Sequence, residues 1–399
     1  MSFGHTIAPM SAAPRMRVLF LVEGFTDIRF VIGLSQISAL TMIVPARAYR
    51  ESQLADRVAE SGASLQVVEI PGGRARFQVE ALGELWRHVA DCDVVLTQEL
   101  LRGTLNANVV GRLRRTPVVA YMGISPLEYF LCRQERRTIG PLTAWLGAAT
   151  IRALVAVNGR LSTRCLAMGP YLRDLAAQWC PRASIGLYYG VDVDRFRPAD
   201  SAERTRLRKS LDLPHDSFLV VLPSRISHEK DPETVLRAVA GARSRGLDAF
   251  LLNLSGGHRE FLALPARLGI RDAVSWVRAR PAAHPMKELA DYFRAADVVA
   301  LASLAEGAAF SLLEALACGT PVAATAVGGI PVQLRGYASL TPRRDADAMA
   351  EALLAIAADP AAARTQALAG RDYVCREWDR ERAFADLAVL LASVAKRPA

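Results

Sequence analysis

The sequence lacks a long uninterrupted hydrophobic run. No stretch reaches the roughly 18 apolar residues that a membrane-spanning helix needs. The apolar run from Arg17 to Val22 is followed at once by Glu23, so it is too short for the core of a signal peptide and predicts a first β-strand. We therefore expect a cytoplasmic protein, or one that lies peripherally on the inner face of a membrane.

The sequence also lacks closely spaced cysteines. No two of the six form a CxxC pair, so neither a zinc site nor a disulfide framework is indicated. Reduced and mostly buried thiols fit a cytoplasmic protein. The cysteines are Cys92, Cys132, Cys165, Cys180, Cys318 and Cys375.

Lysine is scarce, and arginine carries most of the positive charge. The net charge is +9, which favours anionic partners such as phosphorylated substrates or an anionic membrane. No concentrated basic stripe with interleaved aromatic residues is present, so we do not expect a nucleic-acid partner. The lysines are Lys209, Lys230, Lys287 and Lys396.

What the sequence does contain is an alternation of short apolar runs with segments of helical spacing. This pattern predicts βαβ units and parallel sheets, and 399 residues are too many for one ordinary core. The alternation breaks at Tyr188 to Pro198 and then restarts. The expected strands are Val18–Val22, Leu40–Val44, Leu65–Ile70, Asp93–Leu96 and Pro117–Tyr121 before the break, and Phe218–Leu222, Ala249–Leu254, Val274–Val277, Val298–Ala302 and Val322–Thr325 after it.

The predicted fold is therefore α/β, with two Rossmann-like doubly wound parallel-sheet domains that face a central cleft. We place the first domain at residues 1–195 and the second at residues 196–375. Residues 376–399 are expected to form a helix that crosses back to the first domain, with Trp378 as an anchor near its start. Ligands of such sheets bind at the carboxyl ends of the strands, so the cleft is the expected site.

Two glutamates stand eight positions apart in the stretch E-G-A-A-F-S-L-L-E-A-L-A-C-G-T-P-V. Glu306 opens the loop after a predicted strand, and Glu314 lies one turn into the helix predicted from Ser311 to Cys318. The helix start offers backbone N–H groups and a positive dipole end, which bind phosphate, and small loop residues let a ligand approach the main chain. Because a carboxylate repels phosphate, we expect Glu314 to bind ribose hydroxyls. Taken singly, each glutamate is more simply a solvated or salt-bridged residue.

A second group of charged residues follows the strand predicted from Phe218 to Leu222. Arg225 and Lys230 stand at its carboxyl end, where two cations can neutralise a diphosphate. In isolation they are more simply solvated loop cations. Asp231 before Pro232 predicts a helix N-cap followed by proline at the first helical position.

Four features together resemble the retaining glycosyltransferases of family 4, which have the GT-B architecture. They are the E-x7-E pattern from Glu306 to Glu314, the R-x4-K pair of Arg225 and Lys230, the linker signature G-V-D-V-D-R-F and the string V-G-G-I-P. The resemblance is specific from Tyr188 to Pro331 and much weaker in the first domain. It implies a nucleoside-diphosphate sugar as donor substrate, with no cofactor and no metal.

The resemblance also implies roles for single residues. Arg225 and Lys230 bind the donor diphosphate, and Glu306 contacts the donor sugar. Glu314 holds the ribose hydroxyls. Backbone N–H groups complete the donor site at Gly307, Ala308, Phe310, Ser311 and Leu312.

The first domain departs from the family pattern. The loop after the first strand reads V-E-G-F-T-D and has only Gly24 where family members often have a glycine pair. Neither His5 nor His88 matches the histidine that many members place near the sugar, and the corresponding segment reads A-Y-M-G-I-S-P. We expect Gly24 at the donor, and acceptor-side residues at Glu23, Tyr121 and Ser125.

Two further patterns bear on metal and membrane. The D-x-D strings at Asp91, Asp192 and Asp345 do not stand in positions that favour a metal site, so arginine and lysine are expected to replace the metal. The segment 136–179 combines arginines with tryptophan and leucine, which predicts either a peripheral membrane contact or packing within the first domain.

The sequence therefore predicts a retaining, metal-independent hexosyltransferase that acts on a saccharide or lipid-linked hydroxyl acceptor in cell-surface polysaccharide or glycolipid assembly. One alternative is a nucleotide-sugar epimerase or phosphorylase of the same fold, and the other is a non-catalytic nucleotide-sugar-binding subunit. The first alternative needs an acid–base group near the sugar, which the first domain does not obviously supply. The second would explain the missing glycine pair and histidine. Selectivity for the base is expected from residues 256–258 and 276–280.

Overall fold

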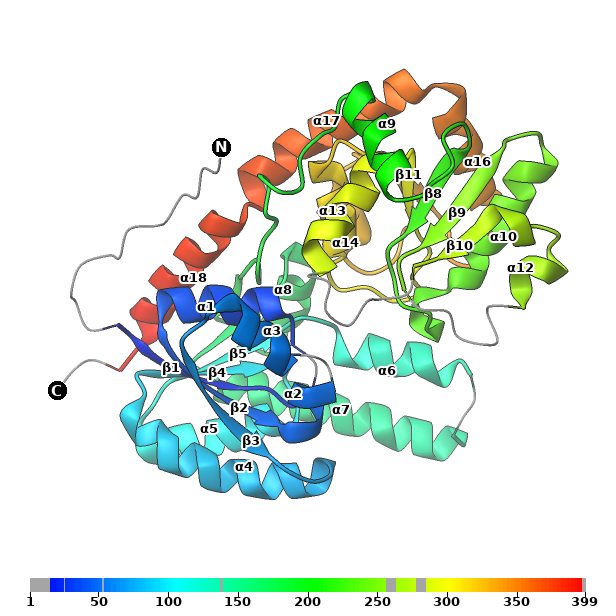
Figure 1. Cartoon of the computed structure of the whole chain (residues 1–399). Helices are drawn as coiled ribbons and strands as arrows, with labels where there is room; N and C mark the ends of the chain where they lie inside the picture. The colour runs from blue at the N-terminus through cyan, green and yellow to red at the C-terminus, as the bar shows by residue number, and fades with distance from the viewer. Residues whose placement is uncertain are drawn as a thin grey trace, which may run out of the picture.

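The computed structural model describes residues 15–24, 26–51, 54–136, 139–255, 263–277 and 285–396 (Figure 1). Two parallel sheets, each flanked by helices, lie one above the other in this view. The fold class predicted from the sequence, with two Rossmann-like domains, is confirmed. His5 and residues 256–258 and 278–280 lie outside the described part of the chain.

The first sheet has seven strands in the order β3-β2-β1-β4-β5-β6-β7. Its central strands are buried along nearly their whole length because helices cover both faces, as is usual for parallel sheets. The strands are β1 (Arg17–Leu21), β2 (Ala39–Pro45), β3 (Leu65–Ile70), β4 (Val94–Gln98), β5 (Val118–Met122), β6 (Arg164–Ala167) and β7 (Ala183–Ile185). The helices are α1 (Ile28–Ile37), α2 (Ala46–Glu51), α3 (Leu54–Ser61), α4 (Arg74–His88), α5 (Arg102–Arg114), α6 (Pro126–Gln134), α7 (Pro141–Leu161) and α8 (Pro170–Ala177), with the 3-10 turn η1 (Val89–Asp91).

The second sheet has six strands in the order β10-β9-β8-β11-β12-β13. They are β8 (Phe218–Leu222), β9 (Ala249–Asn253), β10 (Val274–Trp276), β11 (Val298–Leu301), β12 (Val322–Thr325) and β13 (Ser339–Thr341). The helices are α9 (Ser201–Ser210), α10 (Pro232–Ser244), α12 (Leu264–Arg267), α13 (Pro285–Ala295), α14 (Phe310–Ala317), α15 (Ile330–Leu334), α16 (Ala346–Ala358), α17 (Pro360–Glu377) and α18 (Arg380–Val394), with η2 (His228–Lys230) and η3 (Arg271–Ala273).

Several helix starts in this chain are fixed by local side chains. Asp27 accepts the backbone N–H of Arg29 at the start of α1, and Asp345 caps α16 in the same manner. Asp231 precedes α10 as predicted, but its backbone is left-handed, with φ 40°, and its side chain does not cap the helix. Its Oδ2 atom accepts a hydrogen bond from the Thr234 hydroxyl at 2.6 Å instead.

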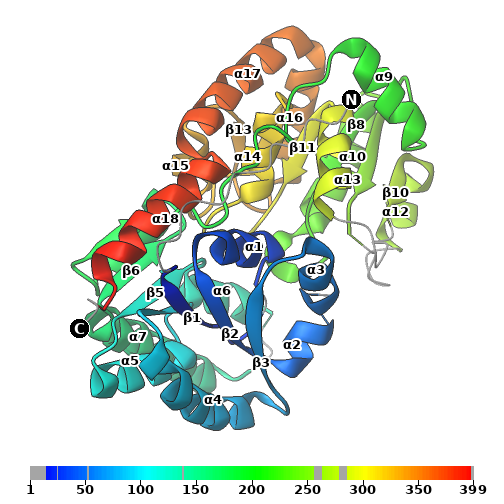
Figure 2. The same ribbon diagram turned by 60° about the vertical axis from the view of Figure 1, so that its left-hand side comes forward.

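The C-terminal segment, which follows the second domain, packs against the first domain and the linker. Helix α18 lies beside α1 of the first domain in both views (Figure 2). A Cβ atom on Gly33 of α1 would lie 1.9 Å from the Phe384 ring, so glycine is required for this close approach. The Trp378 carbonyl accepts the Val191 N–H of the linker at 2.7 Å, and Trp378 is 3% exposed. The exact domain boundaries stay predictions.

Helix α7 is long, apolar and only lightly covered. It is the one described helix long and apolar enough to cross a membrane by length and composition, although Arg152 interrupts it, and 22% of its most apolar window is buried. Its exposed side chains include Leu142 (69%), Trp145 (63%) and Leu146 (51%). Both interpretations of segment 136–179, a peripheral membrane contact and packing within the first domain, stay predictions.

Candidate functional site

Two of the charged residues singled out in the second domain, Lys230 and Glu306, meet at the carboxyl ends of two adjacent strands. Strand β8 pairs with β11 in parallel, so the loops that follow them lie side by side. Lys230 Nζ lies 2.5 Å from Glu306 Oε2, and the Ser303 hydroxyl donates to the same oxygen at 3.0 Å. Residues 76 positions apart in sequence thus form one partly buried ion pair.

Two glycines hold the Glu306 loop in place. The Gly329 N–H donates to the Glu306 carbonyl at 3.0 Å. A Cβ atom would lie 2.0 Å from the Glu306 carbonyl oxygen if placed on Gly328, and 2.1 Å from the Gly307 carbonyl oxygen if placed on Gly329. Gly328 also has a left-handed φ of 51°. The string V-G-G-I-P is therefore needed for the close approach of two loop backbones.

Some backbone N–H groups at the start of helix α14 already donate hydrogen bonds within the protein. The Ala309 N–H donates to the Gln333 Oε1 atom at 2.8 Å, and the Leu312 N–H donates to the Ala309 carbonyl at 3.1 Å. A phosphate contact from Leu312, as predicted, therefore requires the first turn to rearrange. The contacts predicted for Gly307, Ala308, Phe310 and Ser311 stay predictions.

Glu314 is buried and paired with the first domain. Its carboxylate accepts a hydrogen bond from Arg29 of α1, and it is 2% exposed. Arg29 also donates to the Tyr189 hydroxyl at 2.7 Å and pairs with Asp27 at 2.8 Å. Burial raises the pKa of Glu314 to about 7, and Arg29 offsets this rise only in part. The ribose contact predicted for Glu314 therefore requires Arg29 to move.

Arg225 forms part of a charged group that bridges the domains. Its Nη2 atom lies 2.8 Å from Glu229 Oε1 and 2.8 Å from the Tyr129 hydroxyl of α6. Tyr129 in turn donates to Glu229, which is 2% exposed. Burial alone would raise the pKa of Glu229, but the Tyr129 hydrogen bond and the charges of Arg225 and Arg133 lower it to about 2.

A cavity of about 1090 Å³ opens along the carboxyl edge of the first sheet. It extends from the ends of β2 and β3 past those of β1 and β4 to helices α6 and α7. Tyr129 and Arg133 form its limit toward the second domain, so the cavity reaches the group that holds Arg225. Its other charged lining residues are Glu23, Arg47, Glu51, Arg74, Glu99 and Arg102.

Two arginines of the cavity have no ion-pair partner among the described residues. Arg74 begins α4 and Arg102 begins α5, and neither helix has an acidic residue in its first turn. Arg47, by contrast, pairs with Glu51 at 2.8 Å. The start of α5 is capped by Glu23, which accepts the Gly103 N–H at 2.5 Å and a Gln78 amide hydrogen at 2.6 Å. Among the described residues, Arg74 and Arg102 therefore leave two positive charges without an ion pair on this rim, in the cavity that Glu99 also lines.

The sequence of this chain matches a known protein family. The model described as glycosyl transferases group 1 matches residues 203–372. A D-inositol 3-phosphate glycosyltransferase 1 from Catenulispora acidiphila is 32% identical over 303 residues, which are 73% of this chain and 70% of that protein. The chain belongs to the group 1 glycosyltransferases. A D-inositol 3-phosphate glycosyltransferase from Streptomyces avermitilis is 39% identical over 204 residues, but the match spans only 43% of that relative.

Solved structures share the architecture of this glycosyltransferase at low sequence identity. The Anabaena protein Alr3699/HepE in complex with UDP-glucose has a TM-score of 0.75 and 16% identity, with 95% of this chain and 100% of that chain covered. WaaG, a glycosyltransferase involved in lipopolysaccharide biosynthesis, has a TM-score of 0.69 and 15% identity, with 94% and 99% covered. At these identities the likeness shows the fold alone.

The residues predicted for the acceptor side of this glycosyltransferase lie in different environments. Glu23 and Gly24 line the cavity of the first domain. Tyr121 does not: it is 1% exposed, packs against Phe30, and donates its hydroxyl to the Gly186 carbonyl. Placing Tyr121 on the acceptor side was wrong, because a strand residue next to the cleft can equally face the core. Ser125 caps α6 through the Glu128 N–H at 3.4 Å and is 8% exposed.

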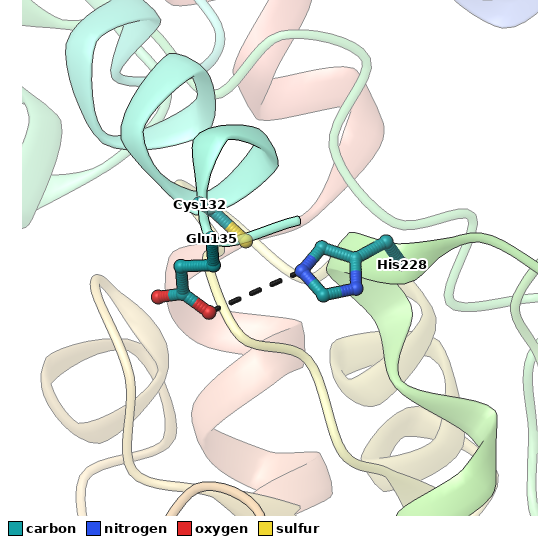
Figure 3. A group of neighbouring side chains, drawn as sticks. All are labelled: Cys132, Glu135 and His228. Carbon is teal, nitrogen blue, oxygen red and sulfur yellow. Dashed lines mark ion pairs between the residues drawn. The ribbon is translucent and has the colours of Figure 1, made fainter. Parts of the chain in front are cut away.

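The structure adds a group of potential metal ligands that the sequence spacing did not indicate. Cys132, Glu135 and His228 offer atoms within 4.8 Å of one another at the junction of the domains (Figure 3). Both Glu135 oxygens are already occupied, one by Arg343 at 2.5 Å and the other by Arg344. Burial and the neighbouring carboxylates raise the pKa of the Cys132 thiol. The two guanidinium groups therefore make Glu135 the centre of an ion-paired cluster between the domains.

Sequence reasoning missed two residues of the site. Arg29 lies in an ordinary helical segment, and nothing near it in sequence indicates that it pairs with a residue 285 positions away. Glu99 follows strand β4 and lines the cavity with a left-handed φ of 71°. Its position at the carboxyl end of a predicted strand was the only available signal.

Proposed function

We propose that this glycosyltransferase moves a sugar from a nucleoside-diphosphate sugar to a hydroxyl acceptor, with retention of anomeric configuration and without a metal ion. The main support is the Lys230–Glu306 pair at 2.5 Å, because a cation and a carboxylate lie side by side at the carboxyl ends of β8 and β11. The cation suits the diphosphate and the carboxylate suits a sugar hydroxyl. The UDP and UDP-glucose complexes of Alr3699/HepE make uridine nucleotides the first donors to test.

The proposed reaction exchanges one bond at the anomeric carbon. The bond to the donor diphosphate breaks, and the acceptor oxygen bonds to the same face of the sugar. The acceptor proton passes to the departing diphosphate, so no protein base is needed. Arg225 and Lys230 would stabilise the negative charge that develops on the leaving group.

The acceptor is proposed to carry a phosphate and to occupy the cavity of the first domain. Support comes from Arg74 and Arg102, whose charges are unpaired among the described residues and together match a phosphate dianion. The relatives from Catenulispora and Streptomyces are named for an inositol phosphate. A phosphorylated polyol and a phosphate-bearing lipid-linked saccharide share this chemistry.

A transfer assay tests the proposed function and separates these acceptors. Purified enzyme is given UDP-, GDP-, ADP- or TDP-glucose with D-inositol 3-phosphate, unphosphorylated inositol or a lipid-linked saccharide phosphate, each with and without EDTA. We expect transfer to a phosphorylated acceptor, unaffected by EDTA, and NMR of the product should show the donor's anomeric configuration. Clean conversion of the donor without acceptor would indicate an epimerase, and donor binding with no turnover would indicate a non-catalytic subunit.

The exposed face of α7 supports a membrane location at the cytoplasmic side and a role in glycolipid or cell-surface polysaccharide assembly. Leu142, Trp145 and Leu146 form an apolar surface on a helix whose only charged residues are arginines. Such a helix suits the headgroup region of an anionic bilayer. Helices α6 and α7 also line the acceptor cavity through Phe130 and Ile151, so lipid and acceptor would meet at one edge.

Vesicle sedimentation tests this location. Wild-type enzyme should sediment with phosphatidylglycerol-containing vesicles and much less with neutral vesicles. A double variant, Trp145→Ser and Leu146→Ser, should lose binding by at least about tenfold, because it exposes far less apolar area to the lipid. A control variant, Val389→Ser, removes an exposed apolar residue on α18 and should bind as wild type. Equal sedimentation of all three would contradict the membrane role.

A further inference from the structure

Glu99 occupies a position whose backbone conformation does not favour a glutamate. It follows β4 directly and lines the cavity at the carboxyl edge of the first sheet. Its backbone is held left-handed at φ 71° by two contacts: its N–H donates to the Tyr121 carbonyl at 2.7 Å, and its carbonyl accepts the Thr104 hydroxyl. A side chain in this conformation is disfavoured relative to glycine or asparagine. Strain of this kind concentrates at functional sites.

The Glu99 side chain has no hydrogen-bond or ion-pair partner among the described residues. Glu23, on the neighbouring strand end, differs because Gly103 and Gln78 satisfy its carboxylate. Glu23 therefore has a structural role as a helix cap, whereas the Glu99 side chain makes no hydrogen bond or ion pair among the described residues that would offset the strain of its backbone. Burial, together with the charge of Glu23, raises the pKa of Glu99 to about 7.

We propose that Glu99 binds hydroxyl groups of the acceptor and thereby makes the enzyme selective for polyhydroxylated acceptors. A carboxylate accepts hydrogen bonds from two neighbouring hydroxyls, which is the pattern a polyol or saccharide presents. The arginines of the same rim would hold the acceptor phosphate while Glu99 orients the carbon ring. This inference rests on the proposed function, and it adds a residue that the family resemblance did not supply.

The charge of Glu99 should depend on pH near neutrality. The carboxylate form binds hydroxyls more strongly than the protonated form, so the acceptor KM should fall as the pH rises from about 6 to about 8. Part of any such change comes from the acceptor phosphate, which also titrates in this range. The other titratable or charged groups that line this cavity are Glu23, Arg47, Glu51, Arg74, Arg102, Tyr129 and Arg133.

Two variants separate recognition from folding. Glu99→Gln keeps the shape and removes the charge, whereas Glu99→Gly removes the side chain and relieves the left-handed strain. We expect both to raise the KM for D-inositol 3-phosphate by at least about tenfold at pH 8, with kcat and UDP affinity changed less than about twofold. Glu99→Gly should melt at the same temperature as wild type or higher. Glu80→Gln, which removes a partly buried charge that pairs with Arg76 on α4 and does not line the cavity, is the matched control.

The pH series supplies the second readout. The wild-type enzyme should gain more acceptor affinity between about pH 6 and about pH 8 than Glu99→Gln, which keeps only the change due to the acceptor phosphate. An unchanged acceptor KM in both variants would overturn the inference and leave the proposed function intact. A lower melting temperature in Glu99→Gly with parallel loss of UDP binding would also overturn it, because the role would then be structural. Wild-type enzyme that binds UDP but transfers to none of the acceptors would overturn the proposed function and this inference together.

Discussion

Glu314 carries the most perturbed carboxyl group of the donor side, and its protonation should be visible in the stability of the protein. Burial raises its pKa from an ordinary value of 4.5 to about 7. The folded state therefore binds this proton more tightly than the unfolded state, and stability falls as the pH rises through this window. The change amounts to about 3 kcal/mol at most.

The variant Glu314→Gln has no proton to lose over the same range. The unfolding free energy of the wild type, measured relative to that of the variant, should therefore fall by up to about 3 kcal/mol between about pH 5 and about pH 7.5. Denaturant unfolding at both pH values measures it, and comparison of the two proteins cancels every other titrating group. A difference that is the same at both pH values would contradict the assigned burial of Glu314.

The ion pair between Lys230 and Glu306 connects the two charged loops of the second domain. Lys230→Ala removes the cation proposed to meet the diphosphate and leaves the Glu306 carboxylate with only Ser303. We expect turnover to fall by at least about tenfold, the scale of one lost charge-assisted contact. Steady-state kinetics with a saturating donor measures this. Lys209→Ala on α9 is the matched control, and equal activity of the two variants would remove Lys230 from the site.

Single residues were predictable from the sequence where the signal was local. Glu306 and Lys230 each follow a strong strand pattern, and parallel strands bring their following loops to one edge. The partners that the structure reveals were not predictable, because Arg29 and Glu314 are joined across 285 positions. Tyr121 was misplaced because strand periodicity does not say which face of a doubly covered sheet points toward the cleft.

At the scale of elements, the two glycines before α15 should be as important as the charged residues. Gly329→Ala would place a Cβ atom 2.1 Å from the Gly307 carbonyl oxygen, so the Glu306 loop must shift. A shift of about 1 Å in a catalytic loop typically lowers turnover by about a hundredfold, and we expect a loss of this order. Kinetic assays with parallel thermal melts measure both effects.

Gly241→Ala is the control for this substitution. Gly241 lies inside α10, and its added Cβ atom would meet only Ala350 at an ordinary 3.5 Å. Alanine favours the helix by up to about 1 kcal/mol, so this variant should be active and slightly more stable. Full activity in Gly329→Ala would show that the loop tolerates displacement and that the close approach has no functional role.

Strong periodicity made most helices and strands predictable, whereas short strands were not predicted. Strands β3, β8 and β12 match their predicted bounds, because each is a compact apolar run. Strands β6, β7 and β13 were not predicted, since they have only three or four residues at or near the sheet edges and carry polar residues.

At the scale of the whole molecule, Glu135 links the domains through arginines of the second domain. It accepts hydrogen bonds from Arg343 and Arg344 and lies 3.9 Å from His228 (Figure 3). Because these side chains are partly exposed, the cluster should contribute less than about 1 kcal/mol to overall stability. Its larger effect should be on how closely the domains approach in the absence of ligand.

Glu135→Gln should therefore separate the domains without unfolding them. Small-angle scattering of the nucleotide-free variant at low salt should show a larger radius of gyration than wild type, with a melting temperature lowered only slightly. Glu377→Gln disrupts an ion pair of similar exposure on the second domain side, with Arg335, and should scatter as wild type. Indistinguishable scattering from all three proteins would show that the Glu135 cluster does not hold the domains together.

The two-domain architecture was the most predictable feature, since it depends on an alternation repeated along the whole chain. The contents of the cleft were less predictable, because they depend on how two independently patterned domains meet. The proposed donor site lies almost wholly in the second domain, where the resemblance is specific. The proposed acceptor cavity lies in the first, where Glu99 and the two unpaired arginines have no motif to mark them.

The central claim is that the cleft binds a nucleoside diphosphate through Lys230 without a metal ion. Thermal stabilisation of wild type and Lys230→Ala by UDP, GDP, ADP and TDP, each with and without EDTA, tests it most directly. One nucleotide should stand out with wild type, adding nearly 3 kcal/mol of stability at about 100 times its dissociation constant, unaffected by EDTA and much reduced in the variant. If no nucleotide stabilises the wild type, or if EDTA abolishes the effect, the donor site described for this glycosyltransferase is wrong.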